Sequence, residues 1–241
     1  MSFSKDPIAY VQNKLDSDAR FTIVCLGDSI TSTEWVHPNW REVVEYVLKE
    51  ELMTDESWKQ ASWGIRFINS GYDGATVQDL LDRFDTAVGQ HKPDLVIYVA
   101  SSNDRHDGIT PEESGRLNDL LLSMIQETGA RTIFCTSTSS YNITYNSKIK
   151  EYNREYEDLK ADSRIDLFRK LQAFDLQGFY TFASSGNAVE GIKPGETDYM
   201  HPNVKGNIYV AKIILEEGFG ISFDAERYLN DLAAGVMMPR Y

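Results

Sequence analysis

The sequence predicts an α/β fold in which a parallel β-sheet is covered by helices on both faces. Short runs dominated by apolar, β-prone residues are typical of strands that are buried on both faces. Between these runs, apolar residues recur three or four positions apart, which is the pattern of amphipathic helices. Strands that alternate with helices pair in parallel through crossover connections. The five predicted strands are residues 21–26, 66–68, 94–100, 131–136 and, most weakly marked, 164–168.

Helix boundaries in the sequence agree with this alternation. Thr110 is a predicted N-cap, because Pro111 follows it in the first turn and Glu113 stands three residues after it. Gly129 ends the same helix just before the fourth strand. The other predicted helices are residues 7–15, 40–52, 76–88, 149–159 and 204–217.

Length and composition indicate one domain over residues 1–241, with an additional N-terminal helix within residues 1–19 and a C-terminal tail at residues 218–241. The formal net charge of −13 argues against nucleic acid and anionic membrane surfaces as partners. The N-terminus lacks a secretory signal and no long apolar stretch is present, so we expect a cytoplasmic protein. The sequence leaves both a monomer and a homo-oligomer open.

Residues capable of chemistry follow the predicted strands. Ligands of an open parallel sheet bind beyond the carboxyl ends of its strands. Ser29 comes directly after the first strand in Gly-Asp-Ser, Gly74 follows the second strand and Asn103 follows the third. Asp198 and His201 stand three residues apart, just before the last long helix.

These residue types are the parts of a hydrolytic serine enzyme. A serine hydroxyl barely ionises at neutral pH and needs a neighbouring base, for which we expect His201. Among the four histidines, His201 alone has a carboxylate three residues before it, so Asp198 can orient the ring from its Nδ1 side. The backbone N–H groups of Ser29 and Gly74 and the side-chain amide of Asn103 are candidates for an oxyanion hole.

The four blocks resemble those of the SGNH hydrolases, also called the GDSL-like esterase and lipase superfamily, in their order along the chain. The matching stretches are residues 27–30 (GDSI), INSGYDGAT with its Gly74, the block-three Asn103, and residues 198–202 (DYMHP). The resemblance implies a flavodoxin-like three-layer α/β/α sandwich with a central, mainly five-stranded parallel sheet. It also implies that Ser29 is the nucleophile, His201 the base, and Ser29, Gly74 and Asn103 the oxyanion donors. One position departs from the pattern: Ser101 stands where block three usually opens with glycine.

The sequence therefore predicts a cofactor-independent serine esterase that cleaves a carboxylic ester of a small molecule through an acyl-enzyme. We favour short acyl groups, such as acetyl on a carbohydrate, over long-chain lipids. Lysophospholipase, thioesterase and acyltransferase activities on the same fold remain alternatives. A non-catalytic flavodoxin-like binding module is the alternative from another class of protein.

Other well-known motifs are missing. The stretch around Ser29 lacks the second glycine of the G-x-S-x-G elbow, no P-loop or G-x-G-x-x-G occurs, and the histidines lack metal-ligand spacing. We therefore expect neither a metal nor another cofactor. Cys25 and Cys135 lie in apolar strands and are expected to be buried, unpaired thiols.

Two residues are candidates for contacts with substrate. Trp35 lies in the loop after the first strand, where an aromatic ring can stack on a sugar or line an acyl pocket, and core packing is its alternative. His106 lies in the loop after the third strand, and the alternative is a solvated loop histidine without a contact to substrate. His37, in the loop after the first strand, has the same two interpretations. For Trp40 we favour packing, because it begins the apolar face of the helix at 40–52.

Overall fold

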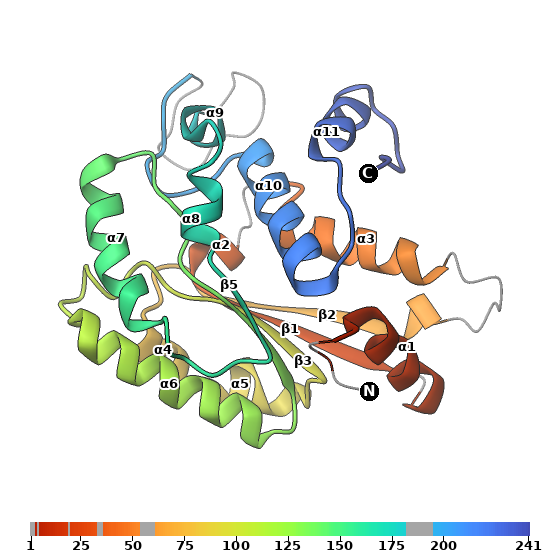
Figure 1. The fold of residues 1–241 in the computed structure, drawn as a ribbon, viewed down its shortest axis with the longest axis horizontal. Helices are drawn as coiled ribbons and strands as arrows, with labels where there is room; N and C mark the ends of the chain where they lie inside the picture. Colours follow the sequence, from red (N-terminus) through yellow and green to blue (C-terminus); the bar gives the residue numbers. More distant parts are fainter. Residues whose placement is uncertain (1–2, 4, 19, 33–35, 54–60, 182–194) are drawn as a thin grey trace.

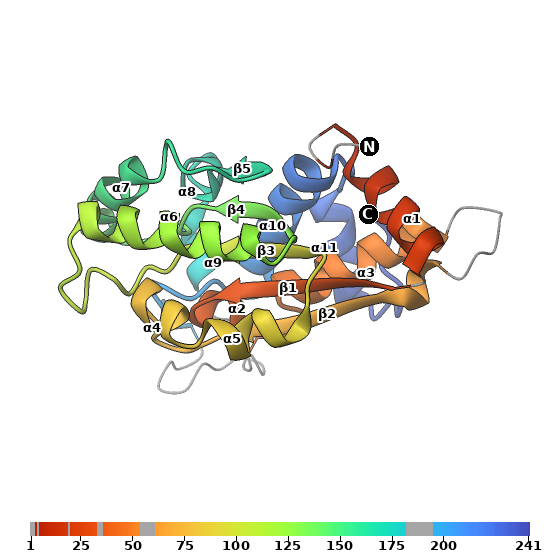
Figure 2. The same cartoon turned by 90° about the horizontal axis from the view of Figure 1, so that it is seen from below.

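Five parallel strands form the centre of the protein in a computed structural model that describes residues 3, 5–18, 20–32, 36–53, 61–181 and 195–241. The strand order is β2-β1-β3-β4-β5, which is the flavodoxin-like order (Figures 1 and 2). The strands are β1 (Phe21–Gly27), β2 (Ile65–Gly71), β3 (Leu95–Val99), β4 (Arg131–Cys135) and β5 (Ser163–Ile165). The predicted flavodoxin-like sheet of five parallel strands is thereby confirmed.

The sequence of each strand matches its position in the sheet. Every residue of β1 and β3, which lie inside the sheet, is buried. The edge strand β2 has a mixed pattern of buried and exposed residues. Phe21 pairs with Ile65 and Gly27 with Gly71, so β1 and β2 end level with each other. The loops that follow them consequently begin at the same edge of the sheet.

Helices cover both faces of the sheet (Figures 1 and 2). One hydrophobic cluster joins one face to helices α1, α3, α8, α9, α10 and α11, and a second cluster joins the other face to α4, α5, α6 and the end of α7. The helices are α1 (Pro7–Asp18), α2 (Ser29–Ser32), α3 (Trp40–Met53), α4 (Val77–Asp82), α5 (Phe84–Ala87), α6 (Pro111–Glu127), α7 (Ile143–Glu155), α8 (Leu167–Leu171), α9 (Leu176–Tyr180), α10 (Val204–Ile214) and α11 (Ala225–Ala233).

Some boundaries differ from the sequence-based expectation. The helix predicted over 76–88 is interrupted at Arg83, which is both the C-cap of α4 and the N-cap of α5. The strand predicted over 164–168 ends at Ile165, because Asp166 accepts a hydrogen bond from the Arg169 N–H and thereby begins α8. The N-cap of Asp166 therefore makes the apolar residues that follow it helical, although their sequence also fits a strand. The predicted Thr110 cap is present, since its side chain accepts from the Glu113 N–H.

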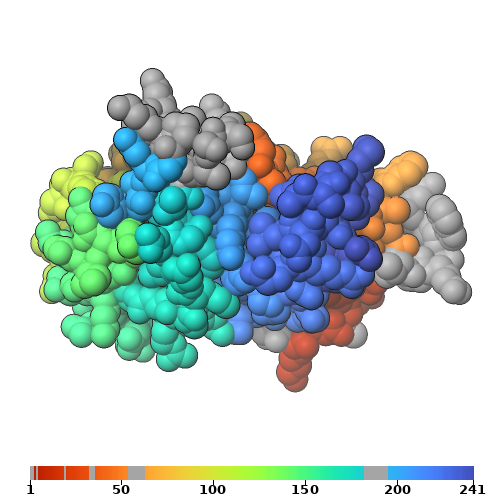
Figure 3. All heavy atoms as spheres, turned by 90° about the horizontal axis from the view of Figure 1, so that it is seen from above, coloured from red at the N-terminus to blue at the C-terminus, as the bar shows by residue number. Residues whose placement is uncertain are grey.

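The C-terminal segment packs against the rest of the protein and contains more structure than the expected tail. A π-helical turn, Leu215–Phe219, continues α10, and α11 follows it with Asp224 as its N-cap. Asp231 accepts two hydrogen bonds from the Arg240 guanidinium, each at 2.8 Å, which pins the chain end to α11. The Tyr46 hydroxyl of α3 donates to the Pro239 carbonyl at 3.0 Å. In the space-filling view this dark-blue segment forms part of the body of the molecule (Figure 3).

Candidate active site

The residues that follow β1, β2 and β3 meet at one edge of the sheet. The chain runs from β1 to β2 on one side and returns to β3 on the other, so the ends of β1 and β3 form the topological switch point at which such folds bind ligands. Ser29 begins the short helix α2 directly beyond β1. Gly71 at the end of β2 allows close packing here, because a Cβ atom at this position would lie 2.1 Å from the Ser32 nitrogen.

Ser29, His201 and Asp198 form a continuous hydrogen-bonded chain. The Ser29 Oγ lies 3.0 Å from His201 Nε2. On the other side of the ring, His201 Nδ1 lies 2.7 Å from Asp198 Oδ2. The side chain of Asp198 is 10 % exposed and that of His201 is 28 % exposed, so the carboxylate is shielded while the imidazole is accessible. This is the arrangement in which an imidazole can remove a proton from a serine hydroxyl.

The loop that carries His201 is held by its own aspartate. Asp198 Oδ1 accepts hydrogen bonds from the backbone N–H groups of Met200 at 2.7 Å and of His201 at 3.0 Å. Each carboxylate oxygen therefore has a separate role, one shaping the turn and the other binding the imidazole. The three-residue spacing in the sequence is the length of this turn.

Asn207, the fourth residue of α10, joins this loop to the start of α3. Its amide donates to the Pro202 carbonyl at 2.8 Å, and its Oδ1 accepts from the Trp40 N–H at 3.1 Å. Asn207 is 1 % exposed, so these bonds are made out of contact with water. Trp40 is fully buried in the core, in agreement with the packing role favoured from the sequence.

The charges of Asp198 and His201 favour a protonated histidine and an ionised aspartate. Burial disfavours the charged imidazole, but the hydrogen bond and the negative charge of Asp198 outweigh it, and the pKa of His201 is raised above its usual 6.5. Burial likewise opposes ionisation of Asp198, yet the hydrogen bond and charge of His201 lower the pKa of this carboxyl. The pair is suited to hold an imidazolium once His201 has accepted a proton.

Gly74 lies in a tight turn that follows β2. The Ala75 N–H donates to the Tyr72 carbonyl at 3.1 Å, which places Gly74 third in a β-turn, with φ at +70°. A positive φ at the third position is the type II geometry that glycine adopts without strain. Among the described residues, no hydrogen bond uses the Gly74 N–H.

Asp28 and Ser101 hold Asn103 in position. Asp28 is buried; its Oδ1 accepts from the Ile30 N–H and its Oδ2 from the Ser102 N–H, both at 3.0 Å. Asn103 Nδ2 donates to the Ala75 carbonyl at 3.1 Å and lies 3.4 Å from Asp28 Oδ2. The carboxylate of Asp28 thus joins the loops that follow β1 and β3. Burial raises the pKa of Asp28, against the hydrogen bonds that it accepts.

Ser101, which replaces the usual glycine of block three, adds a connection to this network. Its hydroxyl donates to the Ala75 carbonyl at 2.6 Å and accepts from the Asn103 N–H at 2.9 Å. Ser101 is 3 % exposed, so the hydroxyl could not remain there without partners. The departure from the family pattern is therefore compensated by two hydrogen bonds, one that ties the block-three loop to the Gly74 turn and one within the loop itself.

The two predicted substrate contacts stay predictions. Trp35 lies outside the described residues, and its role stays a prediction. His106 is exposed, with its ring edge-on to Tyr145 at 6.4 Å between centroids. Burial lowers the pKa of His106, and the nearby Arg105 guanidinium lowers it further. His37 is largely exposed and its Nδ1 lies 3.0 Å from a carboxylate oxygen of Glu42.

Arg105 is a residue near the site that the sequence reasoning missed. Its Nη2 lies 3.2 Å from the sulfur of Met200, the residue before His201, and its guanidinium lies 5.0 Å from the centre of the Tyr145 ring. Its Nε and Nη1 are buried and have no hydrogen-bond partner within the described part of the chain. The available signal was a cation directly after Asn103-Asp104, and the sequence alone could not place it against the histidine loop.

The described residues contain neither a metal-binding cluster nor a membrane-spanning helix. In that part of the chain, no group of three or more His, Cys, Asp or Glu side chains could hold a metal ion. The described helices include none that is long and apolar enough to cross a membrane. Cys25 and Cys135 are buried, unpaired thiols, as expected, and burial raises the pKa of Cys25 to about 12.

The fold and this geometry define a three-layer α/β/α protein with a Ser–His–Asp chain at the carboxyl edge of its parallel sheet. Residues 25–207 match the model of the GDSL-like Lipase/Acylhydrolase family. The protein belongs to this family, which confirms the resemblance to the SGNH hydrolases, and it is a hydrolase of ester bonds.

Solved structures with the same fold include esterases. A catalytic mutant of an acetylxylan esterase from Geobacillus stearothermophilus is 18 % identical and has a TM-score of 0.59, with 85 % of this chain and 95 % of that chain covered. A lipase/acylhydrolase from Enterococcus faecalis is 21 % identical with a TM-score of 0.60, covering 83 % and 96 %. The acetyl xylan esterase AlAXEase is 19 % identical with a TM-score of 0.60, covering 81 % and 98 %. No curated protein matches the sequence.

Proposed function

We propose that the protein is a serine esterase that hydrolyses acetyl or other short acyl esters through an acyl-enzyme, with Ser29 as nucleophile, His201 as general base and Asp198 as the residue that orients the base. The hydrogen-bonded chain from Ser29 Oγ to Asp198 Oδ2, with its links of 3.0 and 2.7 Å, carries this proposal. It gives the hydroxyl a base within reach and gives the base a fixed orientation.

The reaction proceeds in two halves. Ser29 Oγ attacks the ester carbonyl while His201 Nε2 takes its proton, and the oxyanion is stabilised by the N–H groups of Ser29 and Gly74 and by the Asn103 amide. Collapse of this intermediate breaks the bond to the alcohol, which leaves with the proton from His201. Water then attacks the acyl-enzyme with His201 again as base, releasing the acid and restoring the Ser29 hydroxyl.

A carbohydrate ester is the substrate that we propose. Two exposed rings, Tyr141 and Tyr199, stack with centroids 6.2 Å apart and planes within 7°, and Tyr199 is the residue after Asp198. Exposed aromatic rings beside an active site are suited to stack on sugar faces. The acetylxylan esterases of the same fold support the choice of an acetylated sugar.

The mechanism is tested with p-nitrophenyl acetate and a serine-reactive fluorophosphonate. We expect turnover by the wild type, loss to near background in Ser29→Ala, and a single adduct whose mass maps to Ser29. Ser123→Ala, an exposed serine on α6, is the matched control and retains activity. Full activity in pure Ser29→Ala would refute the mechanism. If the wild type shows no turnover and forms no adduct, the result would favour the non-catalytic binding module.

The acyl and sugar preferences need separate measurements. Relative kcat/KM values over a series of p-nitrophenyl esters of increasing chain length should be highest for the short acyl groups. Faster hydrolysis of a thioester or a lysophospholipid than of these esters would favour thioesterase or lysophospholipase activity instead. Tyr199→Ala should raise KM for acetylated xylo-oligosaccharides and leave hydrolysis of p-nitrophenyl acetate almost unchanged. Equal KM values in the variant and the wild type would argue against stacking.

A further inference from the structure

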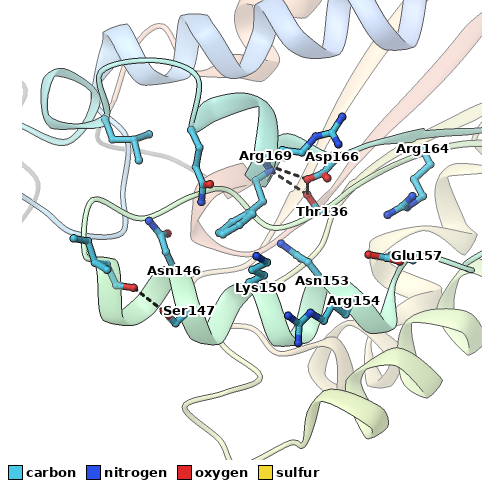
Figure 4. A pocket seen from close by; sticks show the side chains of 14 residues that line it. Thr136, Asn146, Ser147, Lys150, Asn153, Arg154, Glu157, Arg164, Asp166 and Arg169 are labelled. Atoms are coloured by element: carbon cyan, nitrogen blue, oxygen red, sulfur yellow. Dashed lines mark hydrogen bonds between the residues drawn. The ribbon is translucent and has the colours of Figure 1, made fainter.

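A second hollow, outside the candidate active site, lies between α7 and the segment from β5 to α8. Its volume is about 640 Å³, within the range of cavities that hold small molecules. None of its lining residues is one of the predicted catalytic or oxyanion residues. In Figure 4, Lys150 and Arg154 project from α7, and Arg164 and Arg169 come from β5 and α8 on the opposite side.

These four cations have no ion-pair partner among the described residues. The walls of the hollow also contain two carboxylates, Glu157 and Asp166. Asp166 already accepts the Arg169 N–H at 2.9 Å as the N-cap of α8. The formal balance of the lining is therefore four positive against two negative charges, a local excess of cations in a chain of net charge −13.

Asn153 is a second, independent observation at the same hollow. Asn153 lines the hollow and stands between Lys150 and Arg154 in the sequence of α7. It is 8 % exposed, and neither the nitrogen nor the oxygen of its side-chain amide has a hydrogen-bond partner within the described residues. Leaving a buried polar group unpaired costs about 1–3 kcal/mol. A bound molecule with acceptor oxygen atoms would receive hydrogen bonds from the Nδ2 group of this amide.

A purely structural role does not account for the arrangement. β5 is the edge strand of the sheet, and charged side chains protect such edges from pairing with other chains, which would explain Arg164. Lys150 and Arg154 lie on a helix instead. Like charges four residues apart on a helix destabilise it slightly, so these two are retained at a small energetic cost.

We propose that this hollow binds a small anion that carries two or more phosphate or carboxylate groups. The guanidinium groups supply paired donors that match either kind of group, Lys150 supplies a further positive charge, and the Nδ2 group of Asn153 on α7 supplies further N–H donors. The site is independent of the proposed hydrolytic function, because none of its residues takes part in the reaction.

The test is a calorimetric titration of the full chain with pyrophosphate and, separately, with citrate at low ionic strength, where screening is weak. The double variant Lys150→Gln/Arg154→Gln should bind at least about tenfold more weakly than the wild type. The matched control Lys148→Gln/Lys160→Gln removes the same charge from exposed residues outside the hollow and should bind like the wild type. Arg164→Gln, on the opposite wall, is a second variant that should weaken binding.

The outcomes separate clearly. Tighter binding of pyrophosphate than of citrate would identify a phosphate ligand, and the reverse a carboxylate ligand, both within the proposal. Equal affinity in the two double variants would show that the anion binds elsewhere and would overturn it. No heat and no thermal stabilisation with either probe in the wild type would overturn it as well. Because binding and not turnover is measured, failure here leaves the proposed esterase activity untouched.

Discussion

Replacing Asp198 by asparagine tests the central link of the proposed mechanism. In the wild type, Asp198 Oδ2 accepts from His201 Nδ1 at 2.7 Å, so Nε2 is left unprotonated and can receive the proton of Ser29. An amide NH₂ group facing Nδ1 would favour the opposite tautomer, with the proton on Nε2. The oxygen of the asparagine can still accept from the Met200 and His201 N–H groups, so the turn is preserved.

The size of the effect follows from two contributions. A hydrogen bond to a charged group stabilises by about 1.5–3 kcal/mol, which corresponds to roughly 10–150-fold in rate if it is lost in the transition state. The wrong tautomer removes the base from most molecules and brings the total loss to on the order of 10⁴ in kcat. KM should change little, because Asp198 does not contact substrate in the proposed mechanism.

The assay is steady-state hydrolysis of p-nitrophenyl acetate from pH 5 to 9, with circular dichroism to verify folding. Asp158→Asn, an exposed acid after α7, is the matched control and should behave as the wild type. Asp198→Asn should lose activity across the whole pH range while its thermal unfolding remains cooperative. Retention of more than about a tenth of wild-type kcat, in a folded variant, would contradict the assigned role of Asp198.

Three further predictions concern pH, the oxyanion hole and stability. Since the base must be neutral and the pKa of His201 is raised, kcat/KM should fall on acidification through an apparent pKa above 6.5, and an acid limb below 6.5 in the rate profile would contradict this assignment. The stability linked to the raised pKa of His201 is fully present below pH 6.5 and is lost as pH rises through that raised pKa. Asn103→Ala should lower kcat by roughly 10²–10³ with an unchanged yield of fluorophosphonate adduct at saturation, and a rate near wild type would remove Asn103 from the oxyanion hole. Asn207→Ala should lower the free energy of unfolding by about 1–3 kcal/mol because it leaves the Pro202 carbonyl and the Trp40 N–H with fewer partners, and an unchanged urea midpoint would show that these bonds are replaced.

Sequence patterns predicted the sheet well because its strands are strongly apolar and are separated by helices. Every residue of β1 is buried, and a run of that kind has few alternatives to a central parallel strand. Boundaries were less predictable where a polar side chain competes with an apolar run. Asp166 ends β5 and caps α8, and α11 in the expected tail depends on capping by Asp224 and on packing against α3 and α10.

The candidate site was predictable to the extent that its residues follow strand ends. Ser29, Gly74 and Asn103 follow β1, β2 and β3, whereas His201 was indicated by its spacing from Asp198 and its place before α10. The supporting contacts were not predictable. Ser101 is bonded to a carbonyl 26 positions earlier, and Arg105 meets a methionine 95 positions later. Such partners are set by tertiary packing, and the four cations of the second hollow come together from three elements for the same reason.

The Ser29–His201 hydrogen bond joins residues that are 172 positions apart. During synthesis, the proposed nucleophile Ser29 and the whole of β1 leave the ribosome long before the proposed base His201 does. In the proposed mechanism, a nascent chain therefore cannot hydrolyse esters until synthesis has passed His201 and α10 has docked. Esterase activity consequently reports completion of the tertiary fold, and on refolding from denaturant it should return later than the helical circular dichroism signal.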